Sequence, residues 1–334
     1  MSFYEGKKVL IAGGAGLIGQ ALIRALVPLG ADVTATEFRA RRIAREWRDA
    51  VRVINGLDLN RPKWASNDYW AAALKRTNLY DGFDIVFWAA AKVGGAKMIR
   101  ENPMELVHYN LELAARNVQA AVEARVSRFC YLSSSYVYHE TPIANIERDT
   151  GDFDVPIQHY GLGWIKRFME KLCRAHHLTG STEFALVRPA AIYGPYDNFD
   201  LETCHVIPAL IRKVAEGQNP LEVWGDGSEE RQFTFVDDLV EGLLIATERF
   251  GVAQPINIAT PHVSTVNNVW QALFRITGVQ PDWTNLVKYL GDRPRVVNRR
   301  VIDVSNCRNL LGYTCSTSLE DGLRKTLEWY RSQQ

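Results

Sequence analysis

Three glycines near the N-terminus have the spacing of a turn that binds phosphate. Gly13, Gly16 and Gly19 form GxxGxxG in GGAGLIG, directly after a short apolar run and at the start of a helical pattern. Glycine permits a tight turn and a close approach of the backbone, and the free N–H groups at a helix N-terminus attract a pyrophosphate. The pattern therefore predicts dinucleotide contacts from Gly13, Gly16, Leu17, Ile18 and Gly19.

A carboxylate and several arginines follow the next predicted strand. Glu37 lies about 20 residues beyond the glycines, where a carboxylate accepts hydrogen bonds from the hydroxyls of the adenosine ribose. This position favours NAD. NADP stays open as the alternative, because a guanidinium from Arg39, Arg41 or Arg42 would meet its 2′-phosphate. A solvated basic helix start explains these arginines equally well.

Residues at other strand ends complete the predicted cofactor site. Asp58 follows the third predicted strand in INGLDLN, where it is placed to contact the adenine amino group. The small side chains of Ala89, Ala90 and Ala91 end the fourth strand and would let the backbone pass close under the cofactor. The other predicted contacts are Leu59, Pro189 and Ile192.

The elements that must position these residues alternate along the chain. Short β-rich apolar runs are separated by longer helical patterns, the first helix over 17–29. The runs lie at 7–13, 31–37, 51–56, 83–90, 127–134 and 184–190. Repeated βαβ units of this kind predict an α/β fold, a Rossmann doubly wound parallel sheet covered on both faces.

The second part of the chain predicts a smaller C-terminal lobe for substrate. After about residue 190 a run rich in Gly, Pro, Asn and Asp leads to a helix near 207–217 and the polar turn GDGSEER. The stretch FTFVDDLVEGLLIATERF predicts a strand and an amphipathic helix that rejoin the sheet. We therefore expect a dinucleotide-binding domain at 1–190 plus about 233–262, and a substrate lobe at about 191–232 and 263–334.

Composition excludes several classes of protein. The 39 Lys and Arg balance 38 Asp and Glu, so the charge does not indicate a nucleic-acid partner. The five cysteines are odd in number and form no CxxC pair, which argues against a disulfide framework or a thiolate zinc site, and we expect no metal. With no signal peptide or membrane span apparent, we expect a cytoplasmic protein.

The motifs GGAGLIG, WAAAKVGG, YLSSSYVY, RPAAIYGP and FTFVDD together resemble the extended short-chain dehydrogenase/reductase family that acts on nucleotide sugars. The resemblance spans almost the whole chain. GPYDNFDLETCHVIPALIRK and VWGDGSEERQF are most similar to the GDP-L-fucose synthase branch of that family. The resemblance implies a nucleotide-sugar substrate, with GDP as the expected nucleotide, and a homodimer.

The resemblance also implies catalytic residues. Ser134 would hold the sugar hydroxyl, and a Tyr would exchange its proton while the nicotinamide exchanges a hydride with the same carbon. In the family a Lys follows this Tyr by four residues, lowers the phenol pKa and binds the nicotinamide ribose. Here Lys166 matches the Lys and is expected at the ribose.

The sequence departs from this pattern at the tyrosine. Tyr160 lies six residues before Lys166, or about 600° along a helix, so the two cannot share a regular helix face. Leu162 falls where the Tyr belongs, and Trp164 occupies the fourth position after Tyr160. Either the helix begins after Tyr160 and a local loop returns the phenol to its place, or the usual acid/base pair is lacking.

Other departures restrict the reaction. Dehydratases of the family carry Asp-Glu after the catalytic Ser or Thr, whereas this chain has Ser135 and Tyr136, which disfavours dehydration. Fucose synthases have a Cys at the position of Tyr136, and this chain lacks it. They also have a His, which His205 matches. The resemblance implies that His205 would move a proton at a carbon next to a carbonyl. The resemblance and the chemistry of arginine with phosphate predict substrate contacts from Ser135, Tyr136, Asn198, Val206, Trp224, Arg231 and Arg295.

Three functions follow as hypotheses. The first is an NAD-dependent oxidoreductase or epimerase of a nucleotide-diphosphate sugar, with epimerisation at carbon 4 or at carbons 3 and 5. The second is a reductase of a 4-keto sugar nucleotide that consumes NADPH. The third, suggested by the altered Tyr and Lys spacing, is a dinucleotide-binding protein without catalytic activity.

Overall fold

The computed structural model describes residues 2–38, 42–55, 59, 79–92, 103–148, 150–151, 153–279, 286–291 and 297–334. Its main feature is a seven-stranded sheet in the order β11-β6-β5-β4-β1-β2-β3, and every neighbouring pair is parallel. The strands are β1 (Lys8–Ala12), β2 (Asp32–Glu37), β3 (Arg52–Asn55), β4 (Ile85–Trp88), β5 (Arg128–Leu132), β6 (Glu183–Pro189) and β11 (Val252–Ile258). The predicted doubly wound Rossmann sheet is confirmed.

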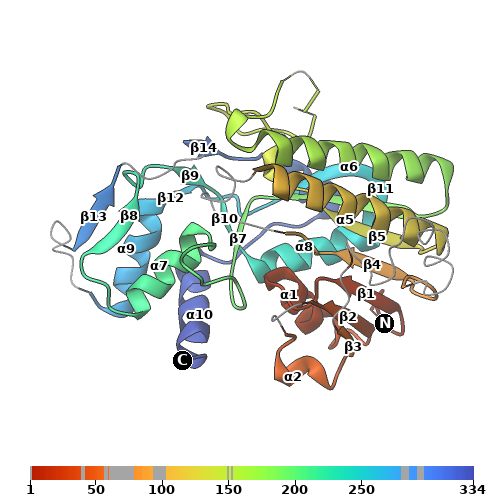
Figure 1. Ribbon diagram of the computed structural model, residues 1–334, viewed down its shortest axis with the longest axis horizontal. Helices are drawn as coiled ribbons and strands as arrows, with labels where there is room; N and C mark the ends of the chain where they lie inside the picture. The colour runs from red at the N-terminus through yellow and green to blue at the C-terminus, as the bar shows by residue number, and fades with distance from the viewer. Residues whose placement is uncertain are drawn as a thin grey trace.

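Helices cover both faces of this sheet (Figure 1). α1 (Leu17–Leu26) and α8 (Val236–Arg249) lie on one face, and α5 (Pro103–Glu123) and α6 (Tyr160–Thr179) on the other. Successive side chains of β1 enter opposite cores: Val9 and Ile11 pack with α1 and α8, whereas Leu10 and Ala12 pack with α5 and α6. The strand is therefore apolar on both sides, as its sequence requires.

A smaller lobe with its own apolar core lies beside the sheet (Figure 1). Its helices are α7 (Val206–Ala215), α9 (Val266–Thr277) and α10 (Leu319–Ser332). Short strands surround them: β8 (Leu221–Trp224) pairs with β13 (Val287–Leu290), and β9 (Glu230–Arg231) lies between β12 (Ser264–Thr265) and β14 (Arg299–Arg300). The lobe is thus built from segments that follow residue 190 in the chain.

One element differs from the prediction. The strand in FTFVDD, β10 (Phe233–Phe235), does not rejoin the main sheet; it pairs with β7 (Ala191–Tyr193) in a separate two-stranded sheet. Both phenylalanines of β10 are buried in the core of the smaller lobe, which holds the strand there. α8 then returns the chain to the main sheet, and β11 forms the edge strand instead.

The described residues show no metal cluster of His, Cys, Asp or Glu, and none of their helices is long and apolar enough to cross a bilayer. All five cysteines are free. Four of them are buried, and Cys204 is half-buried. They act as small apolar side chains in the cores, and burial raises the pKa of each thiol, for example that of Cys130 to about 12.

Candidate active site

The glycine turn joins β1 to α1 at the edge where the strands of the sheet have their carboxyl ends. Gly13 has φ +86°, and a Cβ there would lie 2.9 Å from the backbone of Ala90, so the alanine run passes directly beside the turn. Gly16 is different, because a Cβ there would meet nothing nearer than the Gly13 carbonyl at 3.5 Å, an ordinary contact. Protein packing requires glycine at Gly13 but leaves the side of Gly16 open to a ligand.

The start of α1 has the chemistry that a pyrophosphate needs. Gly16 caps the helix, Leu17 and Ile18 open it, and its first turn contains no acidic residue. The first N–H groups of a helix lack partners within the helix and carry partial positive charge. Thr36 at the end of β2 holds the turn in place, because its Oγ1 accepts from Gly13 N at 2.9 Å. The residues present therefore fit a dinucleotide.

Glu37 is closed off from solvent by the segment that follows β2. Its carboxylate accepts from Arg48 Nη1 and Nη2 at 3.1 and 2.8 Å and from Ile43 N at 3.0 Å. The Arg42 Nε lies 3.7 Å from the same carboxylate. Burial raises the pKa of Glu37, but the Arg48 and Ile43 hydrogen bonds outweigh it and the net pKa is lowered. Arg39, Arg41 and Asp58 lie outside the described residues, and the Leu59 carbonyl accepts from Asn117.

Lys166 lies over the carboxyl end of β5. Its Nζ donates to the Leu132 carbonyl at 2.7 Å and lies 4.9 Å from the centroid of the Tyr131 ring. Burial lowers the pKa of Lys166 to about 8, against the opposing charge of Glu170. Ser134 follows two residues after Leu132, and its Oγ accepts from Tyr136 N at 3.1 Å. The predicted ribose ligand and the predicted sugar ligand are thus neighbours.

The tyrosine is not brought to Lys166. α6 begins at Tyr160 itself, with φ −47° and ψ −57°, so the alternative in which the helix begins after Tyr160 is wrong. A regular helix then directs Tyr160 and Lys166 to different faces. Tyr160 is 42% exposed and faces the Trp164 ring at 6.3 Å. Leu162 lies one turn before Lys166, and a catalytic role for Tyr160 stays a prediction.

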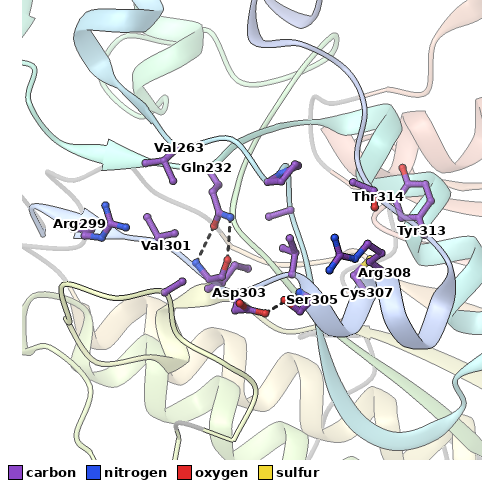
Figure 2. A pocket seen from close by; sticks show the side chains of 15 residues that line it. Gln232, Val263, Arg299, Val301, Asp303, Ser305, Cys307, Arg308, Tyr313 and Thr314 are labelled. Atoms are coloured by element: carbon purple, nitrogen blue, oxygen red, sulfur yellow. Dashed lines mark hydrogen bonds between the residues drawn. The ribbon is translucent and has the colours of Figure 1, made fainter.

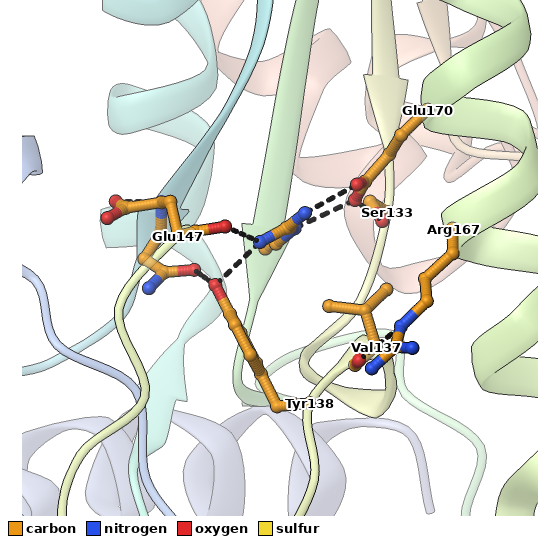
Figure 3. Close-up of polar contacts among 8 residues, drawn as sticks. Ser133, Val137, Tyr138, Glu147, Arg167 and Glu170 are labelled. Atoms are coloured by element: carbon orange, nitrogen blue, oxygen red, sulfur yellow. Dashed lines mark hydrogen bonds and ion pairs between the residues drawn. The ribbon is translucent and has the colours of Figure 1, made fainter. Parts of the chain in front are cut away.

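A buried ion pair fixes α6 against the sheet (Figure 3). Glu170, one turn after Lys166, accepts from Arg188 Nε at 2.8 Å and Nη2 at 2.5 Å, and also accepts from the Ser133 hydroxyl. Arg188 Nη1 donates to the Tyr138 hydroxyl at 2.9 Å, and this hydroxyl donates to Asn257. The network joins α6, β6 and the end of β5, and so it positions Lys166 and the Ser134 turn.

A second group of polar residues adjoins Ser134: Tyr136, His159, His205, Arg231 and Arg300, below called the polar cluster. Arg300 in β14 and Arg231 in β9 are register partners, so their side chains leave the same face of the small sheet. The Arg300 guanidinium lies 4.3 Å from the centroid of the Tyr136 ring. Burial first, and then the charge of Arg300, lower the pKa of Arg231 to about 10. Two adjacent arginines concentrate positive charge at this position.

His159 and Arg300 were not among the predicted residues. His159 is 3% exposed, and its ring lies 4.6 Å from that of Tyr136. Burial first, and then Arg300 and Arg231, lower the pKa of His159 to about 3, so the imidazole is neutral. Within the described parts of the chain, both of its nitrogens and Arg300 Nη1 are buried without a hydrogen-bond partner. The paired arginines in NRRVID were the signal for Arg300, whereas no spacing singled out His159.

His205 lies at the N-terminus of α7 as its cap residue. It is exposed to solvent, yet desolvation by surrounding atoms and then the charge of Arg300 lower its pKa. The effect of the Arg300 charge on the imidazole places His205 near the other residues of the polar cluster.

The remaining predicted residues lie on several different elements. Pro189 ends β6 and Ile192 lies in β7, directly after the end of the sheet. Asn198 is engaged within its own loop, where its Nδ2 donates to Thr203 at 2.8 Å. The others lie as follows: Ser135 is buried after β5, Val206 is 37% exposed at the start of α7, Trp224 is 40% exposed at the end of β8, and Arg295 is outside the described residues.

A separate cavity of about 410 Å³ is lined by residues that include Gln232, Val301 and Arg308 (Figure 2). Gln232 lines it and is bonded to Thr260 and Ile302, whereas the preceding Arg231 belongs to the polar cluster. The residues that line this cavity include none of the predicted site residues.

Comparison with known proteins agrees with this geometry. The sequence model of the NAD dependent epimerase/dehydratase family matches residues 9–259. The chain belongs to this family. It is an enzyme of the family, and the prediction of a nicotinamide dinucleotide cofactor is confirmed.

Relatives match over nearly the whole chain. The chain is 28% identical to "Probable GDP-L-fucose synthase 1" of Oryza sativa subsp. japonica, covering 98% of this chain and 92% of that one. It is 27% identical to "GDP-L-fucose synthase" of Escherichia coli, covering 98% of both. It is also 28% identical to "dTDP-4-dehydro-6-deoxy-D-allose reductase" of a Streptomyces species, covering 98% and 97%.

Solved structures share the fold. The UDP-glucose 4-epimerase of Thermotoga maritima superimposes with a TM-score of 0.81 at 21% identity, covering 98% of this chain and 99% of that one. MoeE5 in complex with UDP-glucose and NAD superimposes with a TM-score of 0.76 at 28% identity, covering 98% and 99%. The predicted family and fold class are both confirmed.

Proposed function

We propose that the protein transfers a hydride at a sugar carbon of a nucleotide-diphosphate sugar, GDP-linked, with epimerisation at carbon 4 or at carbons 3 and 5. One observation carries this proposal: the residues at the carboxyl end of β5, where Lys166 lies, adjoin the polar cluster. Contacts connect them step by step, because Lys166 bonds Leu132, Ser134 bonds Tyr136, and Tyr136 stacks under Arg300.

Each of these residues has a role in this proposal. A nicotinamide dinucleotide held by the glycine turn and Lys166 would supply the hydride chemistry. The glycine turn holds the pyrophosphate of the dinucleotide, Lys166 binds the nicotinamide ribose, and Ser134 holds the reacting sugar hydroxyl. His205 exchanges a proton at a carbon next to the keto group, because a neutral imidazole can accept one.

Arg231 and Arg300 bind the substrate diphosphate. Arg231 donates to three backbone carbonyls, for example to Val297 O at 2.5 Å, so its guanidinium is held in one place. Like charges on paired strands repel each other, and a diphosphate between the two guanidinium groups would turn this repulsion into attraction. The neutral His159 beside them suits an uncharged hydroxyl or amide of the ligand.

The second candidate is a reductase of a 4-keto sugar nucleotide that consumes NADPH. The names of the relatives favour it, since they include fucose synthases and a 4-dehydro sugar reductase. The state of the cofactor separates the two candidates. Purified protein that retains tightly bound NAD favours the epimerase, whereas stoichiometric oxidation of NADPH with a 4-keto sugar nucleotide favours the reductase.

A panel of sugar nucleotides tests the proposal as a whole. GDP, UDP, CDP and dTDP sugars are incubated with the protein and each dinucleotide, and products are resolved by NMR. Turnover restricted to GDP sugars is the expected result. Absence of turnover with every sugar, together with normal dinucleotide binding, would instead favour the protein without catalytic activity that Leu162 suggests. The homodimer stays a prediction, to be measured by light scattering.

A further inference from the structure

The proposed hydride transfer needs a group that exchanges a proton with the sugar oxygen. Leu162 occupies the place on α6, one turn before Lys166, where a tyrosine would do this. We propose that Tyr136, which reaches the same region from the turn after β5, is the catalytic residue for this proton transfer. The inference rests on the proposed function and adds the residue that this function lacks.

The backbone of Tyr136 lies between the predicted sugar ligand and α6. Tyr136 N donates to Ser134 Oγ at 3.1 Å. On the other side, a Cβ at Gly163 would lie 2.4 Å from the Tyr136 carbonyl oxygen, so α6 touches this turn directly. Gly163 follows Leu162 and lies about one helical turn before Lys166. Tyr136 therefore begins where the Ser134 turn meets the part of α6 that lacks the tyrosine.

The Tyr136 hydroxyl is available to a ligand. The side chain is half-buried, and its ring lies 4.3 Å from the Arg300 guanidinium and 4.6 Å from the His159 ring. In the part of the chain that the structure describes, no hydrogen bond engages the Tyr136 hydroxyl. Buried tyrosines with a structural role differ, because the hydroxyls of Tyr4 and Tyr313 donate to backbone carbonyls at 2.7 Å. Tyr136 keeps its donor and its acceptor for a substrate.

Neighbouring side chains are less suited to this proton transfer. Tyr131 lies beneath Lys166 but is 1% exposed, and burial raises its pKa well above the ordinary value. Tyr138 is 2% exposed, and its hydroxyl is already bonded to two side chains. Burial first, and then the charge of Arg300, lower the pKa of His159 to about 3, so its imidazole does not hold a proton at neutral pH. These three groups are poor partners for the sugar oxygen.

Tyr136 moves one proton in each direction of the reaction. In reduction, the carbonyl carbon of the sugar takes the hydride pair of the reduced nicotinamide, its oxygen takes the Tyr136 proton, and solvent reprotonates the phenolate. In oxidation, the phenol first loses its proton to solvent; the sugar hydroxyl then gives its proton to the phenolate as the same carbon gives up its hydride. Positive charge stabilises the phenolate, and Arg300 and its register partner Arg231 supply it beside the ring.

Removal of the hydroxyl alone tests the inference. Tyr136→Phe keeps the ring in the polar cluster, and its kcat is measured with the sugar nucleotide that the panel identifies. We expect kcat to fall about 100-fold or more, while KM and the GDP affinity in calorimetry stay within about threefold of the native values. Tyr330→Phe is the matched control, because its hydroxyl bonds Glu216 on the outer side of the smaller lobe, and it should turn over normally.

A second variant separates catalysis from a structural role. In the Tyr136→Phe background, Leu162→Tyr places a phenol four residues before Lys166 and should restore kcat by about tenfold or more. Leu162→Phe in the same background adds the ring without the hydroxyl and should restore nothing. A purely structural defect at Tyr136 would respond equally to both additions.

Three results would overturn the inference. One is native kcat in Tyr136→Phe, and another is an unchanged kcat with a raised KM, which would make Tyr136 a binding residue only. The third is a loss of kcat in Tyr160→Phe that Tyr136→Phe does not show, which would assign the role to Tyr160. A panel without any turnover removes the proposed reaction together with this role, whereas turnover that persists in Tyr136→Phe removes the role alone.

Discussion

The buried carboxylates of the dinucleotide-binding part and the nitrogens of the polar cluster differ in how they are paired. On the dinucleotide side, Glu37 and Glu170 are buried, and each is paired with an arginine. On the substrate side, His159 and Arg300 hold buried nitrogens without partners in the described structure. Unpaired buried polar atoms cost free energy, and they persist where a ligand completes them. The two buried carboxylates are paired within the chain, whereas a ligand of the polar cluster would supply partners for its buried nitrogens.

The largest expected effect follows from disrupting the buried ion pair between Arg188 and Glu170. Arg188→Met leaves Glu170 as an uncompensated buried charge, and we expect the free energy of unfolding to fall by about 3–5 kcal/mol in urea titration. Glu183→Gln is the matched control, because its 2.8 Å pair with Arg128 is partly exposed and should cost less than about 1 kcal/mol. Equal losses for the two variants would show that burial does not distinguish these pairs.

The next largest effect is expected in the polar cluster, at Arg300. Arg300→Ala should weaken GDP binding by about 10- to 100-fold in calorimetry, because it removes a charge-assisted contact to phosphate. Its free energy of unfolding should stay constant or rise, since the repulsion with Arg231 disappears. Arg308→Ala, an exposed arginine at the separate cavity, is the control and should bind GDP normally. Unchanged GDP binding in Arg300→Ala would remove Arg300 from the proposed site.

Replacement of His159 should change stability and ligand binding in opposite directions. His159→Leu should raise the free energy of unfolding by about 1–2 kcal/mol at neutral pH and weaken sugar-nucleotide binding. The folded pKa of about 3 lies below the ordinary 6.5, so the unfolded chain binds the proton first and native stability falls as the pH drops below 6.5. The variant should lack this part of the acid dependence. A variant less stable than the native protein would show that the imidazole has a partner.

The last effect concerns the pH dependence of stability at Lys166. Its folded pKa of about 8 lies below the ordinary 10.5, so ionisation opposes folding at neutral pH, and this opposition fades as the pH rises from 8 to 10.5. The free energy of unfolding of the native protein should therefore rise relative to that of Lys166→Met by up to about 1 kcal/mol per pH unit in this range. Lys171→Met, an exposed lysine of the same helix, should show no such difference. Parallel pH profiles for native protein and Lys166→Met would contradict the assignment.

The sequence by itself determined the dinucleotide half. The order of apolar runs predicted the parallel sheet, and GGAGLIG predicted the turn, because strand, turn and helix are contiguous and their geometry depends on local backbone conformation. The six-residue separation of Tyr160 and Lys166 also predicted their divergence once the helix began at Tyr160. These conclusions need no contact between distant segments.

Only the tertiary structure decided the rest. Glu37 is conspicuous in the sequence as a ribose ligand, yet Arg48 reaches it only because the chain folds back after β2. Arg300 meets Tyr136 from a distant part of the sequence, and β10 joins β7 because its phenylalanines pack in the smaller core. Such contacts depend on the packing of whole elements, and no local spacing encodes them.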